Sequence, residues 1–266
     1  MHFSSAPSLR DVGSQLCTAL QFSEPDYDRL CAEIRQDKVY HRKQWEYIYT
    51  LRVLEKFGLL RGGATGIGFG CGKEPLAAVM AKYGCRIVAT DIAPVDKGDA
   101  HWGSSSAEEL FYPGICDKSV FLERVSFRPV DMNAIPDDLG THDFLWSCCA
   151  FEHLGSLEAG ISFVLNANKC LKPGGVAIHT TEYNFSSDDE TLESPGLSLY
   201  RKRDLHSLVD RIERQGDRVL PLDLRGGDLP QDNYVDLPPY EQKTHLKLLI
   251  EKFVTTSIGF VAVKGR

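Results

Sequence analysis

The sequence predicts an α/β protein with a doubly wound, mostly parallel sheet of seven strands and a layer of helices at its N-terminus. Two observations predict this class. From residue 62 onward, short apolar runs alternate with stretches of helical periodicity, and a glycine-rich turn at 66–72 separates the first run from the first helix. Such alternation places parallel strands in one sheet with helices on both faces. The closing run, 253–264, is dominated by β-branched residues, and we expect a strand there that can pair antiparallel.

The N-terminal segment carries a helical pattern. Apolar residues recur in steps of three from Trp45 to Phe57, which predicts one buried helical face. We therefore divide the chain into an N-terminal helical extension over 1–60, placed to act as a lid, and a core domain over 61–266. The charged residues at 41–46 suit either a solvated face or contacts to a ligand beneath that lid.

The remaining elements follow in order along the core. We expect strands over 64–70, 85–91, 124–131, 142–150, 174–182, 218–224 and 253–264, and helices over 74–84, 157–171 and 201–214. Three long connections, 93–116, 183–200 and 225–243, follow strands at the edge where α/β proteins bind ligands. We expect these connections to select the substrate.

Composition limits the classes of partner. The chain has 266 residues, a net charge of -7 and 42% hydrophobic content. It shows no broad positive run, so nucleic acid is not expected as a partner. No stretch predicts a membrane span or a signal peptide. The eight cysteines form no Cys-x-x-Cys pair, which favours reduced thiols, a cytoplasmic location and no structural zinc.

Glycine stands at every second position from Gly66 to Gly72. Between a strand and a helix, such a run lets the backbone turn tightly and leaves room for a ligand against it. A nucleotide-like ligand is therefore expected. The P-loop pattern is absent, because Ile67 and Glu74 stand where it needs glycine and a hydroxyl, and the dinucleotide pattern fails in every frame.

The run Gly68–Gly72 resembles motif I of the class I S-adenosylmethionine-dependent methyltransferases, which have a Rossmann-like fold. The resemblance extends over residues 62–182. It implies S-adenosylmethionine as cofactor and S-adenosylhomocysteine as product, with Asp91 holding the ribose, and Asp131 and Met132 beside the adenine. The residues that it implies for cofactor binding are Gly68, Phe69, Gly70, Gly72, Asp91, Ile92, Asp131, Met132, Ser147 and Cys148, joined by Trp45 and Arg42 from the lid.

One position departs from the family pattern. The family often carries an acid two residues before the first motif glycine, where it contacts the amino group of the cofactor. Here that position is Gly66. The partner of the amino group is therefore left open.

Three residues are candidates for the catalytic group that accepts a proton. Glu152 and His153 follow the fourth strand, and a histidine with an ordinary pKa of about 6.5 is available as a base. Glu182 lies near the expected carboxyl end of the fifth strand. In ubiquinone-type O-methyltransferases, which this segment resembles, a Glu-His pair binds a divalent metal with an acid three residues earlier. That position is Cys149 here, so a metal is left open without support.

The expected reaction is in-line methylation of a hydroxyl on a small molecule or carbohydrate, with a side chain as general base. The carbohydrate preference comes from polar residues clustered in the last long connection, namely Asp228, Asp232, Asn233 and Asp236. N-methylation of a small amine is the nearest alternative. An NAD-dependent oxidoreductase on a related fold and a catalytically silent cofactor-binding domain are the others.

Overall fold

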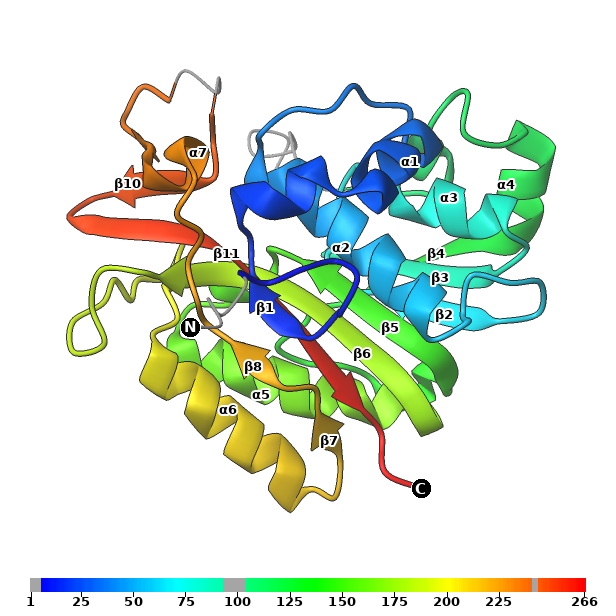
Figure 1. Ribbon diagram of the computed structural model, residues 1–266. Helices are drawn as coiled ribbons and strands as arrows, with labels where there is room; N and C mark the ends of the chain where they lie inside the picture. Colours follow the sequence, from blue (N-terminus) through cyan, green and yellow to red (C-terminus); the bar gives the residue numbers. More distant parts are fainter. Residues whose placement is uncertain (1–5, 93–103, 241–243) are drawn as a thin grey trace.

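The computed structural model describes residues 6–92, 104–240 and 244–266 (Figure 1). Within them, one sheet holds eleven strands. Five strands run parallel in the order β4-β3-β2-β5-β6, and β11 pairs antiparallel with both β6 and β7. This is the predicted seven-stranded core, and the antiparallel pairing of the last strand is confirmed. Its strands are β2 (Thr65–Gly68), β3 (Arg86–Asp91), β4 (Val125–Pro129), β5 (His142–Cys148), β6 (Leu171–Asn184), β7 (Arg218–Val219) and β11 (Phe253–Val263).

Four short strands extend the sheet beyond this core. The predicted strand at 218–224 is divided around Pro221, because proline has no N–H for the ladder. Strand β1 pairs antiparallel with β11 and parallel with β8. The N-terminal extension is therefore not helical throughout, and one of its segments lies inside the sheet of the core. The added strands are β1 (Ser14–Leu16), β8 (Leu222–Asp223), β9 (Val235–Asp236) and β10 (Lys247–Ile250).

Helices cover both faces of the sheet (Figure 1). One face carries α1 (Pro25–Glu33), α2 (Arg42–Lys56), α3 (Leu76–Lys82) and α4 (Lys118–Arg124), and the other carries α5 (Leu157–Ala167) and α6 (Lys202–Arg214). None of the described helices is long and apolar enough to cross a membrane. The remaining helical turns are α7 (Pro230–Asn233) and the 3-10 turns at Ala19–Ser23, Glu108–Leu110, Asp137–Leu139, Phe151–His153 and Asn168–Cys170.

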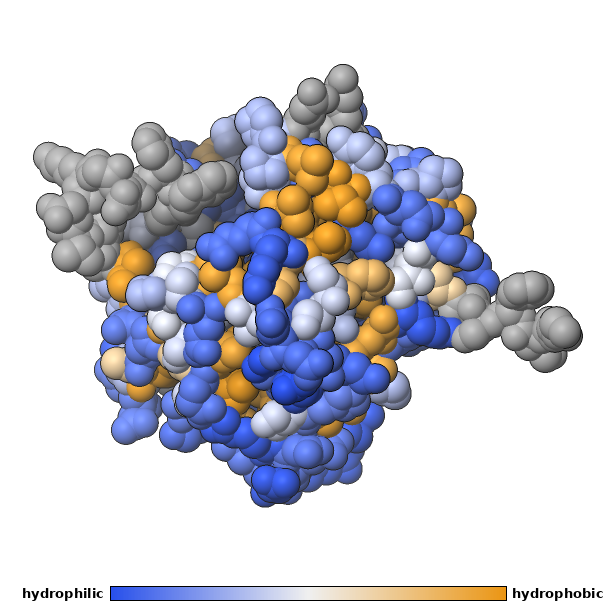
Figure 2. All heavy atoms as spheres, turned by 90° about the vertical axis from the view of Figure 1, so that its left-hand side faces the viewer, coloured by the Kyte–Doolittle hydropathy of each residue, from blue (hydrophilic) through white to orange (hydrophobic). Residues whose placement is uncertain are grey.

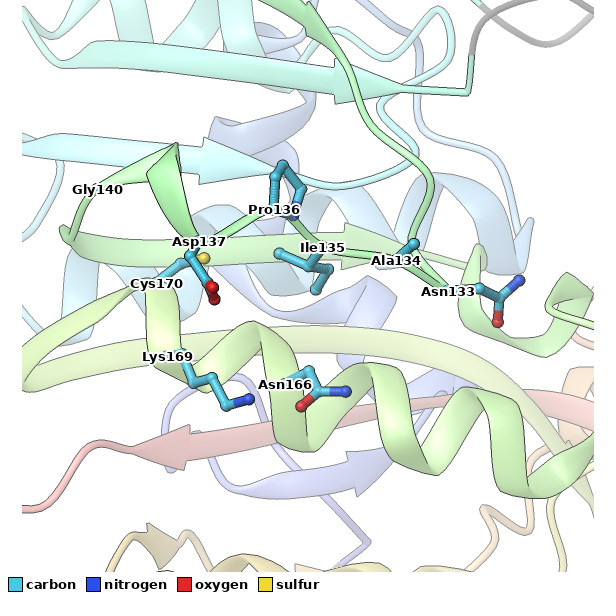
Figure 3. A pocket seen from close by; sticks show the side chains of 9 residues that line it. All are labelled: Asn133, Ala134, Ile135, Pro136, Asp137, Gly140, Asn166, Lys169 and Cys170. Carbon is cyan, nitrogen blue, oxygen red and sulfur yellow. The ribbon is translucent and has the colours of Figure 1, made fainter.

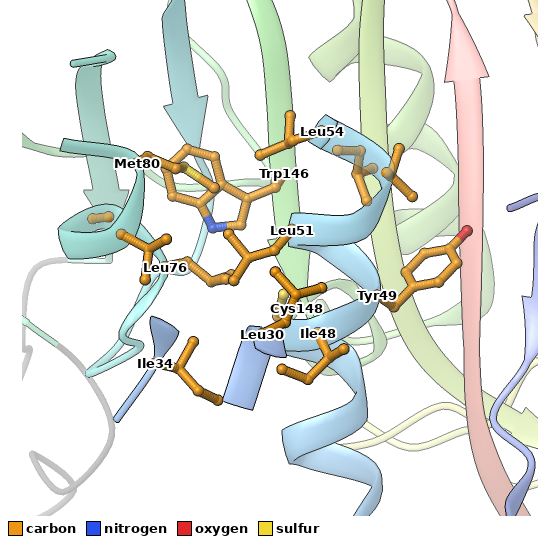
Figure 4. Packing of buried hydrophobic residues seen from close by; sticks show 14 of the residues in the cluster. Leu30, Ile34, Ile48, Tyr49, Leu51, Leu54, Leu76, Met80, Trp146 and Cys148 are labelled. Carbon is orange, nitrogen blue, oxygen red and sulfur yellow. The ribbon is translucent and has the colours of Figure 1, made fainter. Parts of the chain in front are cut away.

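The apolar face of α2 packs directly on the sheet. Figure 4 shows Leu51 and Leu54 of α2, with Leu76 and Met80 of α3, gathered around Trp146 of β5. All of these side chains are fully buried. Since the same helix begins with charged residues, its packing brings those charges to the carboxyl ends of β5 and β6.

Candidate functional site

Two glycines of the motif are required by the neighbouring strand. A Cβ on Gly66 would lie 2.3 Å from Cε2 of Phe144, and one on Gly68 would lie 2.3 Å from Cζ2 of Trp146. Both rings are fully buried in β5. Side chains are therefore excluded at these positions by core packing, whether or not a ligand is bound.

The next two glycines are required by the turn itself. Gly70 and Gly72 have φ values of +62° and +49°, a left-handed conformation that costs other residues free energy. The turn is held by a hydrogen bond of 3.0 Å from the Cys71 N–H to the Thr90 carbonyl. The turn lies at the carboxyl end of β2, between the ends of β3 and β5, and a Cβ on Gly70 would lie 2.8 Å from the Cβ of Ala150.

Asp91 lies beside this turn at the end of β3. Its carboxylate accepts hydrogen bonds from the backbone N–H of Gly72 at 3.0 Å and of Ser104 at 3.1 Å. The Ile92 N–H donates to its other oxygen at 2.8 Å. These bonds fix the carboxylate next to the glycine turn. Oδ2 already accepts two of them, and Oδ1 retains a lone pair with which to accept from a ribose hydroxyl. Ile92 is 55% exposed.

The segment after β4 reaches the same turn. The sulfur of Met132 lies 3.4 Å from the point where a Gly70 Cβ would stand. Asp131 is exposed and accepts from the Asn133 N–H at 2.8 Å. A bare turn, an acid fixed for a diol and a thioether beside them fit the adenosyl part of S-adenosylmethionine.

Four residues predicted to bind the cofactor have side chains in the core: Trp45, Phe69, Ser147 and Cys148. Trp45 is fully buried, donates its indole N–H to Gln21 and stacks on Tyr49 with ring centroids 4.9 Å apart. Its large ring fills the space between α2 and the N-terminal segment, so it does not cover the site. Phe69 packs edge-on against Phe163 on the opposite face of the sheet.

Ser147 is the third of these. Its hydroxyl lies 2.7 Å from Nδ1 of His179, and both side chains are fully buried. Burial lowers the pKa of His179 to about 3, so this imidazole is neutral and belongs to the core. Cys148 faces the other side, where its thiol lies 3.6 Å from the Thr50 hydroxyl.

Arg42 meets an acid at the end of the fifth core strand. Its guanidinium pairs with Glu182, whose second oxygen accepts from the Thr255 hydroxyl at 3.1 Å. The side chains of Arg42 and Glu182 are 16% and 5% exposed. Burial would lower the pKa of Arg42, but the combined attraction of Glu182, Cys149 and Glu46 raises it above its ordinary value, so the guanidinium stays charged.

Lys43 and Glu46 form a second charged contact one turn along α2. The Lys43 ammonium lies 3.1 Å from Glu46 and donates to the Cys148 carbonyl at 2.9 Å. Glu46 is fully buried, and it also accepts from the Cys149 thiol at 2.9 Å and the Ser257 hydroxyl at 2.6 Å. Burial would raise its pKa, but Lys43 and these donors lower it below the ordinary value.

Cys149, Glu152 and Glu182 bring one ligand-type atom each within 4.8 Å of one another. Such a set is close enough for a metal ion. However, the Arg42 guanidinium already neutralises Glu182, and the Cys149 thiol donates to Glu46. Two of the three groups thus already have partners, and we assign no metal ligands.

Glu152 is fully buried. One carboxylate oxygen accepts from the Thr181 hydroxyl at 3.1 Å, and the other has no partner among the described residues. Burial raises the pKa of Glu152 to about 7, and the negative charge of Glu182 adds to the rise. This acid therefore exchanges its proton near neutral pH.

His153 is hydrogen-bonded outside this pair of acids, although it is close enough to lower the pKa of Glu152. Its ring is exposed, and Nδ1 is 2.7 Å from the Gly196 carbonyl. The structure thus brings Glu152 and Glu182 together and turns the imidazole toward the connection at 183–200. The same connection is bonded to both acids, since Ser198 N–H donates to the Glu152 carbonyl at 2.8 Å and Tyr200 N–H to the Glu182 carbonyl at 2.9 Å.

Two acids anchor the last long connection to residues outside it. Asp232 is buried, where it accepts from the Ala19 N–H at 2.7 Å, and Asp236 is buried at 2.6 Å from Nδ1 of His245. Asp228 and Asn233 are exposed. Figure 2 shows the side of the molecule on which this connection lies. Hydrophobic residues lie among hydrophilic ones on that surface. Trp102 and part of the connection at 93–116 lie outside the described residues.

A cavity of about 270 Å³ opens on the α5 side of the sheet (Figure 3). It is lined by the segment between β4 and β5 and by Asn166, Lys169 and Cys170. Its lining includes neither the glycine turn nor Asp91 nor the buried acids. We therefore define the candidate site by the side chains that lie together at the carboxyl ends of the strands.

Sequence reasoning missed one acid at these strand ends and underrated two charged residues. Glu74, two positions after Gly72, is buried with its carboxylate 3.4 Å from the Trp146 indole nitrogen. Lys43 and Glu46 suited a solvated face as well as a site, because the sequence did not reveal which way the first turn of α2 points. The signal that could have found Glu74 is an acid inside an otherwise apolar helix start.

Comparisons with known proteins agree with this geometry. A family model described as a methyltransferase domain matches residues 38–219. A proposed sarcosine dimethylglycine methyltransferase from Galdieria sulphuraria has a similar structure, with 16% identity, a TM-score of 0.54 and coverage of 90% of this chain and 98% of that chain. A proposed methyltransferase from Bacillus halodurans gives 16% identity, a TM-score of 0.53 and coverage of 81% and 99%. No curated protein matches the sequence.

The matched segment runs from the start of α2 to β7 and contains the glycine turn, Asp91 and both buried acids. It covers more than half of the chain. The solved structures share the fold at low identity. The nicotinamide alternative is therefore set aside, and the chain belongs to the class I S-adenosylmethionine-dependent methyltransferases.

Proposed function

We propose that the protein methylates a hydroxyl group of a small molecule or carbohydrate, with Glu152 as the group that accepts the proton. The observation that carries this proposal is a pair of buried atoms without partners. Glu152 Oε1 can only accept a hydrogen bond when ionised, Arg42 Nε can only donate one, and neither has a partner among the described residues. Both side chains adjoin Glu182.

A hydroxyl group suits this pair because it donates and accepts at once. Leaving both atoms unpaired costs free energy that a hydrogen-bonded substrate would recover. An acceptor hydroxyl can donate to Glu152 Oε1 while an oxygen of the same molecule accepts from Arg42 Nε. A polyhydroxylated molecule offers several such oxygens, which supports a carbohydrate.

The proton then moves to Glu152 as the acceptor oxygen bonds to carbon. The cofactor, when bound, supplies a methyl group made electrophilic by its sulfonium. Glu152 titrates at about pH 7, which is close to the best value for a base that works at neutral pH. The ion pair with Arg42 holds Glu182 in place, and the Glu182 carboxylate raises the affinity of Glu152 for the proton. Glu182 is thus a positioning residue in this scheme.

The polar residues of the last connection support the carbohydrate less than the sequence suggested. Asp232 and Asp236 are buried and hold the connection in place. Asp228 and Asn233 remain exposed, and the same connection carries the hydrophobic side chains of Leu229 and Leu237, which are 38% and 55% exposed. An acceptor with both hydroxyl groups and an apolar part fits this surface best.

A panel of acceptors with methyl-labelled S-adenosylmethionine tests the proposal. The panel contains sugars and glycosides, phenols, and small amines at equal concentration. We expect label in hydroxyl compounds, and a loss of about 100-fold or more in kcat for Glu152→Gln with S-adenosylhomocysteine affinity unchanged. Label in amines alone, with Glu152→Gln as active as the wild type, would overturn the proposal in favour of N-methylation.

A further inference from the structure

The structure explains why the usual acid before the glycine motif is missing. Any side chain at position 66 would begin 2.3 Å from the ring of Phe144, a fully buried residue. The motif therefore needs glycine there, and another group has to meet the cofactor's α-ammonium. Backbone carbonyls are one source, but a carboxylate binds an ammonium more strongly.

Glu74 is a buried carboxylate with few partners. It is 6% exposed, its only hydrogen bond among the described residues is from the Trp146 indole N–H at 3.4 Å, and the nearest cation is Lys43 at 4.0 Å. By contrast, the equally buried Glu46 is saturated by an ammonium, a thiol and a hydroxyl. Of the two acids, Glu74 is the one that lacks a close positive charge.

Its place in the fold matches the amino acid end of the cofactor. The sheet order β3-β2-β5 puts Asp91 on one side of the glycine turn and the end of β5 on the other. A ligand with its ribose at Asp91 that lies along the turn has its far end at β5. Lys43, which donates to the Cys148 carbonyl there, lies between that strand end and Glu74.

We propose that Glu74 binds the α-ammonium of the cofactor, with Lys43 beside it for the α-carboxylate. Together the two side chains present one negative and one positive charge to a zwitterion. The inference rests on the cofactor of the family and is independent of the acceptor proposed above. It also assigns a role to an acid that core packing alone does not explain.

Release of a proton when the cofactor binds would be a specific signature of this role. Burial is the main cause that raises the pKa of Glu74 to about 8, against the attraction of Lys43, with Glu46 and Asp91 adding to the rise. At pH 7 the free protein therefore holds Glu74 largely protonated. Arrival of an ammonium favours the carboxylate, so binding should release close to one proton to the buffer.

Isothermal titration calorimetry at pH 7 tests the inference without any methyl transfer. Two ligands are compared: S-adenosylhomocysteine, and 5′-methylthioadenosine, which lacks the amino acid end. The proteins are the wild type, Glu74→Gln, and the matched charge control Glu108→Gln, whose side chain is exposed. Titrations in buffers of different ionisation enthalpy count the protons released.

We expect Glu74→Gln to bind S-adenosylhomocysteine at least about 10-fold more weakly, while 5′-methylthioadenosine binds unchanged. Wild type and Glu108→Gln should release close to one proton with S-adenosylhomocysteine, and Glu74→Gln none. Equal weakening of both ligands would make Glu74 structural and overturn the inference. So would unchanged affinity, or a wild type that releases no proton, a measurement that needs no variant to fold.

Discussion

Arg42, the first residue of α2, forms an ion pair with Glu182 at the end of β6, 140 positions away. The contact joins the N-terminal extension to the strand end where the two acids of the candidate site meet. It makes the extension part of the site as well as part of the core.

Breaking this pair should destabilise the fold. Arg42→Met leaves the Glu182 carboxylate buried without its cation, which we expect to lower the free energy of unfolding by about 3–5 kcal/mol. The double variant Arg42→Met/Glu182→Met removes both charges and should recover most of the loss. Urea unfolding measures both.

The exposed pair between Lys252 and Glu190 is the control for that experiment. Its side chains are 69% and 70% exposed, so Lys252→Met should leave the unfolding midpoint nearly unchanged. A double variant that is no more stable than Arg42→Met would contradict the ion pair as the cause.

Stability should fall as the pH rises from 7.2 to 8. Burial raises the pKa of Glu74 to about 8 and of Glu152 to about 7, so the folded state holds protons that the unfolded state has lost. The stabilisation from these protons is complete below the unfolded pKa of about 4.3 and is lost as the pH rises through 7 to 8. Each acid contributes a slope of at most about 1.4 kcal/mol per pH unit.

In this pH range the buried histidines contribute little to the change in stability. Burial lowers the pKa of His41 to about 4, of His179 to about 3 and of His142 below its ordinary value. Their contribution has the opposite sign and fades as the pH rises above the unfolded value of about 6.5. Unfolding curves at pH 7.2, 7.6 and 8 should therefore show the decline, and Glu74→Gln and Glu152→Gln should each flatten it. An increase of stability across this window is the contradicting result.

Gly66→Ala should destabilise the protein without affecting its cofactor site. Its methyl group would overlap the Phe144 ring at 2.3 Å, an overpacking that costs about 1–3 kcal/mol. Gly66→Ala/Phe144→Leu should regain part of that loss, because the smaller side chain leaves room. S-adenosylhomocysteine affinity in the folded variant should stay unchanged. A variant as stable as the wild type, but unable to bind, would mean that this glycine faces the ligand.

Methyl transfer should not depend on a divalent metal. Arg42 and Lys43 already supply positive charge to the acids, and burial raises the pKa of Cys149 well above its ordinary value, which keeps the thiol a poor ligand. Incubation with EDTA followed by gel filtration should leave the initial rate intact. Loss of activity that Mg²⁺ or Zn²⁺ restores would show that the three converging atoms hold a metal after all.

The architecture could be predicted because periodicity and turn residues are local. The alternation of apolar strands with helical faces predicted the core sheet, and the fold of the family confirms it. Strand β1 could not be predicted, because its three residues are ordered by pairing with β11 and β8, which are distant in sequence. Pro221 likewise divides a run that reads as one strand.

Site residues could be predicted from the sequence where they lie at the end of a predicted strand. Asp91 follows its strand directly, and the structure places it at the glycine turn as expected. The direction of a side chain on a short turn cannot be predicted from its position along the chain. Glu152 and His153 are adjacent in the chain, yet one is buried beside Glu182 and the other is exposed. Trp45 matched a lid residue in sequence, but an aromatic core residue has the same pattern.

A crystal structure of the complex with S-adenosylhomocysteine tests the central claim most directly. We predict the ribose hydroxyls on the Asp91 carboxylate, the adenine beside Met132 and the thioether sulfur over the bare backbone of Gly70–Gly72. Ligand bound elsewhere, or the turn covered by the protein's own side chains in crystals that contain it, would contradict the account.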